Sequence, residues 1–275
     1  MLWEELTAKH FEAAVKDCNG VCVLPIGVIE KHGDHLPVAT DMITARAVCA
    51  AAAEREPAVV FPYYFFGQIA EARHYPGTVA ASNRLLMDNL LAVCDEIARN
   101  GMKKILILSS HGGNDFFLPF FAQGLTELGR DYSVYTGSLN DARFLITEKI
   151  AKAAGTDDLG QHAGVAETAL VMHIRPDLVH MEDQNPAECA DLHRLDEIKR
   201  RSLFTGYNWY ASFPNHFSGD PSKATPELGA MIFDALTESV AGHIRAVKAD
   251  SVSEGLVREF KARAIKPEAG VKTLP

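Results

Sequence analysis

The sequence predicts a single α/β domain built around a mainly parallel β-sheet. Short apolar runs that suit buried strands alternate along the chain with longer segments of helical periodicity. The run over residues 104–110 is apolar on both faces, as a central parallel strand would be. We find no internal repeat and no low-complexity linker, so residues 1–275 are expected to form one domain, with a weakly patterned tail from about residue 250.

Composition excludes several classes of protein. Hydrophobic residues make up 47% of the chain and charged residues 23%, which is ordinary for a globular domain. The net charge of -9 and the absence of a basic stripe argue against nucleic acid as a partner. No apolar run reaches the length of a membrane span, and the N-terminus lacks the features of a secretory signal. The five scattered cysteines suit a reducing compartment, so we expect a cytoplasmic protein with no membrane partner.

Periodicity assigns the expected elements of the N-terminal half. We expect helices over 3–17, 41–56 and 82–100, and strands over 21–26, 58–61 and 104–110. Ser82 is a good N-cap for its helix, and Gly101 ends that helix. The long stretch 62–81 has no clear periodicity; a functional loop and a hydrophobic interface loop explain it equally well.

The C-terminal half is expected to continue the alternation. We expect helices over 116–128 and 141–154, with a strand over 132–136 between them. A further helix opens at 162–164 and is closed by Pro176, and the segment 183–223 is loop-rich. A helix over 224–247 carries Pro226 in its first turn, and a peripheral helix and tail follow.

Several candidate metal ligands follow the strand over 21–26. Glu30 and His32 are two residues apart, so in extended backbone both point to one side. Asp41 lies where a helix should begin, and His35 lies between. Carboxylates and imidazole together suit a divalent transition metal. The alternative is a polar loop in which Asp41 only caps a helix.

Two further motifs carry titratable side chains. His111 follows the strand over 104–110 in a Ser-His-Gly-Gly-Asn turn, whose glycines let the backbone approach a ligand closely. The alternative is a tight turn with an incidental histidine. His162 precedes a helix and Glu167 lies in its first turn, where the helix dipole favours a carboxylate in any case. Because active sites of parallel sheets form at the carboxyl ends of strands, the turns after 21–26 and 104–110 can converge.

Together these motifs resemble the creatininase (creatinine amidohydrolase) family. The resemblance rests on Glu-Lys-His-Gly-Asp-His-Leu-Pro at 30–37 with Asp41, Tyr-Pro-Gly-Thr at 75–78, Ser-His-Gly-Gly-Asn at 110–114 and His-Ala-Gly-Val-Ala-Glu-Thr at 162–168. The motifs occur in the family's order and at similar spacings. The resemblance implies a three-layer α/β sandwich around the parallel sheet, commonly a homohexamer, with a hydrolytic site that binds two metal ions.

The resemblance also implies a role for each candidate residue. Glu30, Asp41 and His111 would hold one divalent ion; His32 and Asp41 would hold the second, so that Asp41 bridges. We assign Glu167 as a further ligand, with general base as its fallback role. His162 would pass a proton to the leaving group. Zinc is the first expectation for both ions, and manganese and iron are the alternatives.

Some positions depart from the family pattern. Gly113 stands where creatinine-cleaving members have a glutamate that binds the second metal. Tryptophans that those members use before the His162 position are missing from 132–161, so creatinine itself is not the expected substrate. Lys31 and Asp34 replace the usual Gln and Pro; Asp34 either adds charge at the mouth of the site or pairs with Lys31. His35 is expected to orient a ligand and not to bind metal.

The expected function is metal-dependent hydrolysis of a cyclic or formyl-type amide C–N bond in a small-molecule substrate. One alternative is hydrolytic ring opening of a cyclic ketone or diketone from sugar or cyclitol degradation, and another is trimming of a modified peptide. A non-catalytic metal-binding scaffold is the alternative from a different class. A scaffold would have no need to retain a proton shuttle such as His162, so we favour an enzyme.

Overall fold

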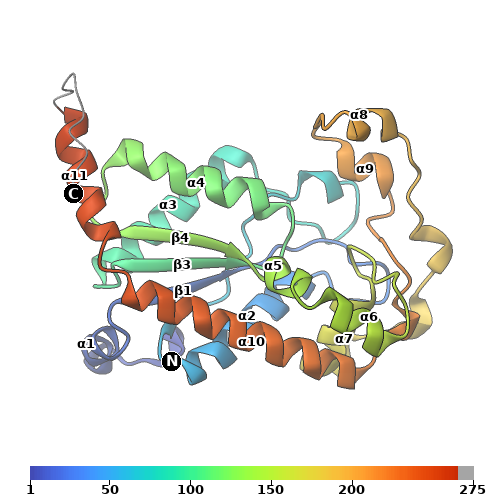
Figure 1. Cartoon of the computed structure of the whole chain (residues 1–275), viewed down its shortest axis with the longest axis horizontal. Coiled ribbons are helices and arrows are strands. Elements are labelled where there is room, and N and C mark those ends of the chain that lie inside the picture. The colour runs from blue at the N-terminus through green and yellow to red at the C-terminus, as the bar shows by residue number, and fades with distance from the viewer. Residues whose placement is uncertain (266–275) are drawn as a thin grey trace.

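The computed structural model describes residues 1–265, and in that range the chain forms an α/β fold (Figure 1). The strands are β1 (Val21–Ile26), β2 (Val59–Val60), β3 (Lys104–Ser109) and β4 (Ser133–Ser138). The helices are α1 (Ala8–Asp17), α2 (Thr40–Arg55), α3 (Asn83–Arg99), α4 (Asn114–Leu128), α5 (Leu139–Phe144), α6 (Thr147–Ala154), α7 (Val165–Ile174), α8 (Asp196–Arg200), α9 (Asn208–Ser212), α10 (Pro226–Ala249) and α11 (Ser253–Ile265).

Across residues 1–265 the strands form one sheet in the order β2-β1-β3-β4, and every pairing is parallel. β1 and β3 pair along their whole length, from Val21 opposite Lys104 to Ile26 opposite Ser109. Both strands therefore end at the same level of the sheet. The turn that carries Glu30 and the turn that carries His111 start side by side, as the sequence predicted for a parallel sheet.

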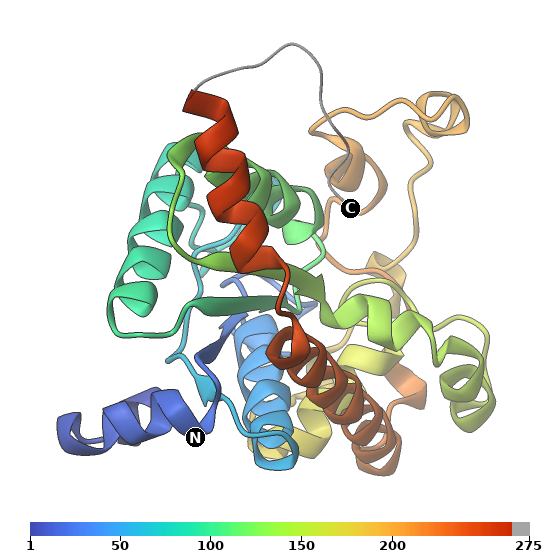
Figure 2. The same cartoon turned by 60° about the vertical axis from the view of Figure 1, so that its left-hand side comes forward.

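Helices cover both faces of the sheet (Figure 2). Side chains of β1 and β3 alternate between two apolar clusters: Val21 and Leu106 pack with α2, α7 and α10, whereas Cys22 and Ile105 pack with α1, α3 and α4. Since both faces are buried, the central strands are apolar at nearly every position. The expected three-layer architecture around a parallel sheet is confirmed.

Two expected helices differ from those in the structure. The helix expected over 3–17 is a 3-10 turn at Trp3–Glu5 followed by α1, because Leu6 adopts an extended conformation between them. The helix expected over 141–154 is divided into α5 and α6 around Leu145 and Ile146. The division leaves Leu145 exposed while Ile146 packs against the main core cluster, so burial of one side chain overrides continuous helical periodicity.

The segment 183–223 is loop-rich, as expected, and contains the short helices α8 and α9. In Figure 1 these helices lie beyond the carboxyl ends of the strands. The expected peripheral helix is present as α11, which contacts α4 and β4. Residues 266–275 of the expected tail lie outside the described residues. No helix in the described part of the chain is long and apolar enough to cross a membrane.

Candidate metal centre and active site

Close packing of α2 on the end of β1 places Asp41. A Cβ atom on Gly27 would lie 2.2 Å from the backbone nitrogen of Met42, so only glycine allows this approach. The Thr40 hydroxyl donates to the carbonyl of Pro37 at 2.7 Å and fixes the entry into the helix. Asp41, in the first turn of α2, therefore points into the same space as Glu30.

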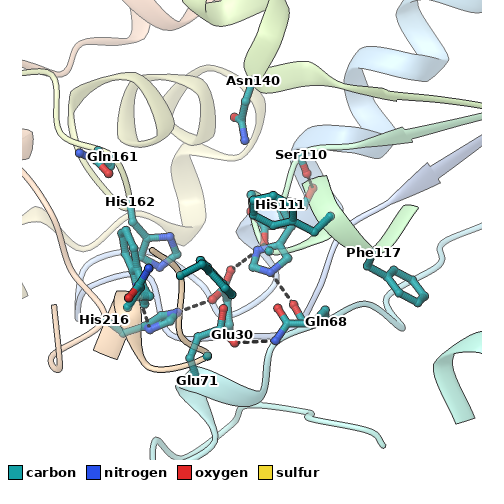
Figure 3. A pocket seen from close by; sticks show the side chains of 18 of the residues that line it. Glu30, Gln68, Glu71, Ser110, His111, Phe117, Asn140, Gln161, His162 and His216 are labelled. Atoms are coloured by element: carbon teal, nitrogen blue, oxygen red, sulfur yellow. Dashed lines mark hydrogen bonds and ion pairs between the residues drawn. The ribbon is translucent and has the colours of Figure 1, made fainter. Parts of the chain in front are cut away.

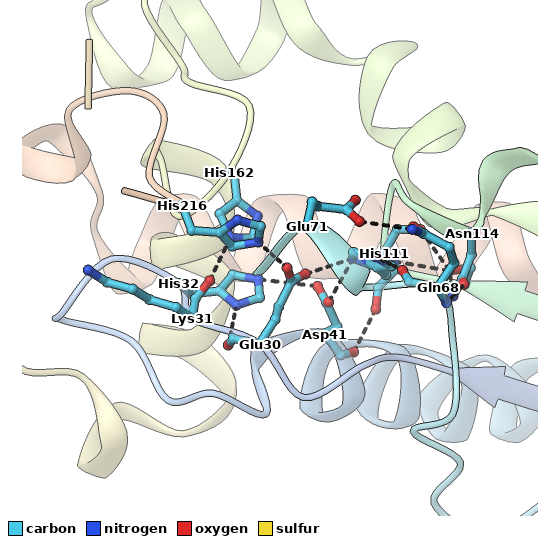
Figure 4. Close-up of polar contacts among 12 residues, drawn as sticks. Glu30, Lys31, His32, Asp41, Gln68, Glu71, His111, Asn114, His162 and His216 are labelled. Carbon is cyan, nitrogen blue, oxygen red and sulfur yellow. Dashed lines mark hydrogen bonds and ion pairs between the residues drawn. The ribbon is translucent and has the colours of Figure 1, made fainter. Parts of the chain in front are cut away.

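Glu30, Asp41 and His111 form the first group of candidate ligands (Figure 4). His111 Nδ1 lies 2.7 Å from Glu30 Oε1 and 3.2 Å from Asp41 Oδ2. On the other side of the ring, Nε2 lies 2.7 Å from the backbone carbonyl of Gln68. Because a carbonyl oxygen can only accept, Nε2 carries a proton, and Nδ1 is the nitrogen that faces the two carboxylates.

His32 faces the other oxygen of Asp41. Its Nε2 lies 3.3 Å from Asp41 Oδ1 and 4.0 Å from Glu167 Oε2. Its Nδ1 lies 3.3 Å from the backbone carbonyl of Glu30, so Nδ1 donates there and Nε2 is the nitrogen that faces Asp41. Asp41 thus presents one oxygen to each histidine and would be shared between two ions if both groups bound one.

The buried acceptors of this cluster fit metal ions. Within residues 1–265, Glu30 Oε1, His32 Nε2 and Asp41 Oδ2 are among the buried side-chain atoms that have no hydrogen-bond partner. Buried acceptors without a donor are unfavourable, and acceptors that face one another require a cation between them. The mixture of carboxylate and imidazole donors suits a divalent transition metal.

The carboxylates of the cluster also favour the positively charged forms of His32 and His111. Burial disfavours the charged imidazole of His32, but Asp41, Glu30 and Glu167 outweigh it and raise the pKa to about 9. Burial likewise opposes protonation of His111, yet Glu30 and Asp41 raise the pKa of this imidazole well above its ordinary value. In the metal-free protein, protons therefore occupy the positions that suit metal ions.

His162 lies beside the second group. Its ring centroid is 4.1 Å from that of His32, and its side chain is near enough to Glu30 and His32 to belong to a ligand set with them. Nε2 donates to the backbone carbonyl of Lys31 at 2.8 Å, so Nε2 carries the proton and Nδ1 of the neutral ring has a lone pair that can accept one. Burial, followed by the charge of His32, lowers the pKa of His162 to about 4, so the imidazole is neutral at pH 7.

Glu167 is held by two donors of its own. Arg143 donates to Oε1 at 3.1 Å, and the backbone nitrogen of Ala163 donates to Oε2 at 2.7 Å. Burial opposes ionisation, but Arg143, His162 and His32 outweigh it and lower the pKa of the Glu167 carboxyl. Glu167 is therefore an ionised carboxylate whose Oε2 is turned toward His32, and Arg143 is a site residue that the sequence did not reveal.

Two more residues of the site were not predicted from the sequence. His216 Nε2 donates to Glu30 Oε2, and the indole N–H of Trp209 donates to His216 Nδ1 at 3.1 Å. The ring of Trp209 also lies 5.7 Å, centroid to centroid, from the ring of His162. Both residues come from the loop-rich segment 183–223, which contains no motif that could have identified them. One oxygen of Glu30 is thus fixed by hydrogen bonding and the other is left for a metal ion.

Gln68 and Glu71 of the loop 62–81 line the cavity of the site. This position favours a functional loop over a hydrophobic interface loop. Besides the carbonyl that holds His111, the Gln68 side chain donates to Glu71 Oε2 at 2.8 Å. A Cβ atom on Gly113 would lie 2.4 Å from His111 Nε2 and 2.7 Å from the Gln68 carbonyl oxygen. The position that carries a glutamate in creatinine-cleaving members can therefore hold no side chain in this arrangement.

The remaining residues of the first motif support its shape. Lys31 pairs with Asp34 at 3.0 Å, which favours the pairing role over a free charge at the mouth of the site. His35 Nε2 lies 3.0 Å from Thr168 Oγ1, and that hydroxyl donates to the carbonyl of Ala163. His35 therefore supports the turn that carries Glu167, consistent with a role in orienting ligands.

The candidate ligands other than His32 line one large cavity of about 640 Å³ (Figure 3). Its polar floor holds most of the groups described above. Its outer wall is apolar and aromatic. The floor is lined by Glu30, Asp41, Gln68, Glu71, His111, His162, Glu167 and His216, and the wall by Met87, Phe116, Phe117, Phe120, Phe204 and Trp209.

Comparison with known proteins identifies relatives over nearly the whole chain. The creatinine amidohydrolase of Pseudomonas putida is 30% identical over 260 residues, covering 88% of this chain and 95% of that protein. A mycofactocin precursor peptide peptidase of Mycolicibacterium smegmatis is 29% identical and covers 83% of this chain and 85% of that protein. The 3-dehydro-scyllo-inosose hydrolase of Thermotoga maritima is 21% identical over 92% of this chain and 78% of that protein.

Solved structures show the same relationship. A mutant creatininase of Zn-Zn type superposes with a TM-score of 0.73 at 25% identity, covering 90% of this chain and 98% of that chain. The sequence pattern of the creatininase family, described as creatinine amidohydrolase, matches residues 4–244. Its relatives are hydrolytic enzymes, and the motifs at Glu30, His111 and His162 meet in one cavity. The chain is a hydrolase of the creatininase family.

Proposed function

We propose that this protein hydrolyses an amide C–N bond with the help of two divalent metal ions, zinc in the first place. The observation that carries the proposal is the position of Asp41, whose two oxygens face His32 and His111 separately. Glu30 would complete the site at His111, and Glu167 the site at His32. A solved relative is a creatininase of Zn-Zn type, which supports zinc.

Bound ions would polarise a carbonyl group and make a nearby water more acidic. His162 would then accept and donate the proton that the reaction transfers. Neutral His162 has an Nδ1 lone pair that can accept a proton from water. Once protonated, His162 can pass that proton to the departing nitrogen. Arg143 keeps the Glu167 carboxylate ionised and oriented while this happens.

The proposed substrate contains a cyclic or formyl-type amide. Creatinine is not proposed, because the chain has no tryptophan in 132–161 and no glutamate at position 113. Ring opening of a cyclic ketone is the second candidate, and it is supported by the similarity to an inosose hydrolase. A homohexamer in the cytoplasm stays part of the proposal; the free cysteines, all within the described residues, suit a reducing compartment.

Metal content tests the proposal first. Protein purified without chelator should contain close to two divalent ions per chain by elemental analysis, and Asp41→Asn should contain markedly less. Turnover of cyclic amides, formyl amides and cyclic ketones would then be compared on the same preparation. One ion per chain would favour a single-metal mechanism, and none after addition of zinc or manganese would favour a non-catalytic scaffold.

A further inference from the structure

The cavity extends well beyond the candidate metal ligands. Its volume of about 640 Å³ lies in the range of roughly 300–1,000 Å³ that holds drug-sized ligands. A small ring with its amide would fill only the part of this volume next to the polar floor. The remaining space is bounded by the aromatic outer wall, and in Figure 3 Phe117 lies at the end of the cavity away from His162 and His216.

The four phenylalanines of the outer wall, Phe116, Phe117, Phe120 and Phe204, come from two segments that are distant in sequence. Phe116 and Phe120 stand four residues apart in α4, so they share one side of that helix. Phe204 approaches from the loop before α9, and its ring centroid lies 5.6 Å from that of Phe116. Phe116 is 76% exposed and Phe204 is 71% exposed, although both are large apolar side chains. A rim of exposed aromatic rings around a polar floor is typical of a site that binds an apolar group.

We propose that this aromatic wall, formed by Phe116, Phe117, Phe120 and Phe204, binds an apolar group of the substrate, aromatic or long aliphatic, attached to the amide that is hydrolysed. The inference rests on the proposed function and adds the substrate class to it. The occupant is substrate and not a second copy of the chain, because the wall is continuous with the cavity that holds His111 and His162. A wall of this kind selects amides by the apolar surface that they bury.

Hydroxamic acids provide the probe, since their head group chelates zinc and their tail can be varied. The zinc-loaded protein would be titrated calorimetrically with acetohydroxamate, octanohydroxamate and benzohydroxamate. Each methylene group removed from water strengthens binding about fourfold, so partial burial of the octanoyl tail should give at least about tenfold tighter binding than acetohydroxamate. Benzohydroxamate should also bind more tightly than acetohydroxamate.

Wall variants test where the tail binds. Phe116→Ser and Phe204→Ser should reduce the preference for octanohydroxamate to about threefold or less, while acetohydroxamate binding stays unchanged. Phe144→Ser is the matched control: Phe144 is 67% exposed on α5 and does not line the cavity, so the preference should persist. Size-exclusion chromatography of each variant would accompany the titrations.

The titrations distinguish a failure of the metal-dependent function from a failure of the apolar subsite. If no hydroxamate binds, even with zinc added, the proposed function fails. If all three bind with equal affinity, or if the wall variants keep the full preference, the metal site stands and the apolar subsite is overturned. A change in assembly size in Phe204→Ser, with no change in the preference, would also overturn it and identify the wall as an interface between copies.

Discussion

At the scale of the residue, the site depends on which nitrogen each histidine turns inward. The Nε2–H of His111 donates a hydrogen bond to the carbonyl of Gln68, and the Nδ1–H of His32 donates to the carbonyl of Glu30. His111 is therefore poised to bind through Nδ1 and His32 through Nε2. Backbone carbonyls thus orient both imidazoles before any ion binds, which reduces the reorganisation that binding requires.

His162 is expected to be needed for proton transfer and not for metal binding. His162→Ala should keep its metal ions and lose turnover by at least about 100-fold, the usual contribution of a positioned proton-transfer group. Metal content and turnover would be measured on the same sample. Since His162 also lies within ligand distance of Glu30 and His32, loss of an ion in this variant would make it a ligand and contradict the assignment.

His216 is expected to act through Glu30. His216→Ala removes the donor to Glu30 Oε2 and should weaken zinc binding about 10- to 100-fold, as loss of such supporting hydrogen bonds does elsewhere. Trp209→Phe keeps an aromatic ring but removes the indole donor to His216, so its effect should be smaller and in the same direction. Competition with a chromophoric chelator measures both affinities, and unchanged affinity in His216→Ala would refute this role.

At the scale of the element, the site depends on how closely α2 packs against the end of β1. Gly27→Ala would place a methyl group 2.2 Å from the Met42 nitrogen, so the first turn of α2 must shift and carry Asp41 with it. We expect destabilisation of about 1–3 kcal/mol together with weaker metal binding. The measurements are urea unfolding and zinc titration.

Gly124→Ala is the matched control for this substitution. Gly124 lies inside α4, where an added Cβ meets nothing within 4 Å, and alanine is the better helix former. This variant should be at least as stable as the parent, with unchanged metal binding. If Gly27→Ala behaved like Gly124→Ala, the close approach of α2 to β1 would not be what places Asp41.

At the scale of the whole molecule, metal ions and protons compete for the same buried cluster. The pKa of His32 is raised to about 9 in the metal-free protein, so protonation stabilises that form fully below pH 6.5. This stabilisation is lost as the pH rises through about 9. Metal ions bind the neutral imidazoles, so their stabilising effect increases over the same interval.

The difference in Tm between zinc-loaded and chelator-treated protein should therefore widen from pH 6 to pH 9. Scanning calorimetry at several pH values within that window measures it. In His32→Gln the titrating group is absent, so the metal-free form should lose less stability as the pH rises. A constant difference in Tm across the window would show that protons and metal do not share His32.

Sequence patterns correctly predicted the features that depend on residues close together in the chain, namely the strands and the ligand motifs. The apolar strand around Leu106 predicted the parallel sheet, and the Glu30, Asp41 and His111 motifs predicted a cluster at its carboxyl edge, which the structure brings together. Periodicity failed at Leu145 and Ile146, because the break between α5 and α6 serves packing against distant helices. Whether the clustered residues bind metal stays a prediction.

The family, the α/β architecture and the types of side chain at the site can be predicted from the amino-acid sequence, because motif residues and apolar periodicity are local properties of the chain. The partners that complete the site depend on contacts that form only in the folded chain. Arg143 donates to Glu167, His216 donates to Glu30 and Trp209 supports His216, and no spacing rule links these partners. The aromatic wall was also decided by folding, since Phe116 and Phe204 meet only when α4 and the loop before α9 are brought to the same cavity.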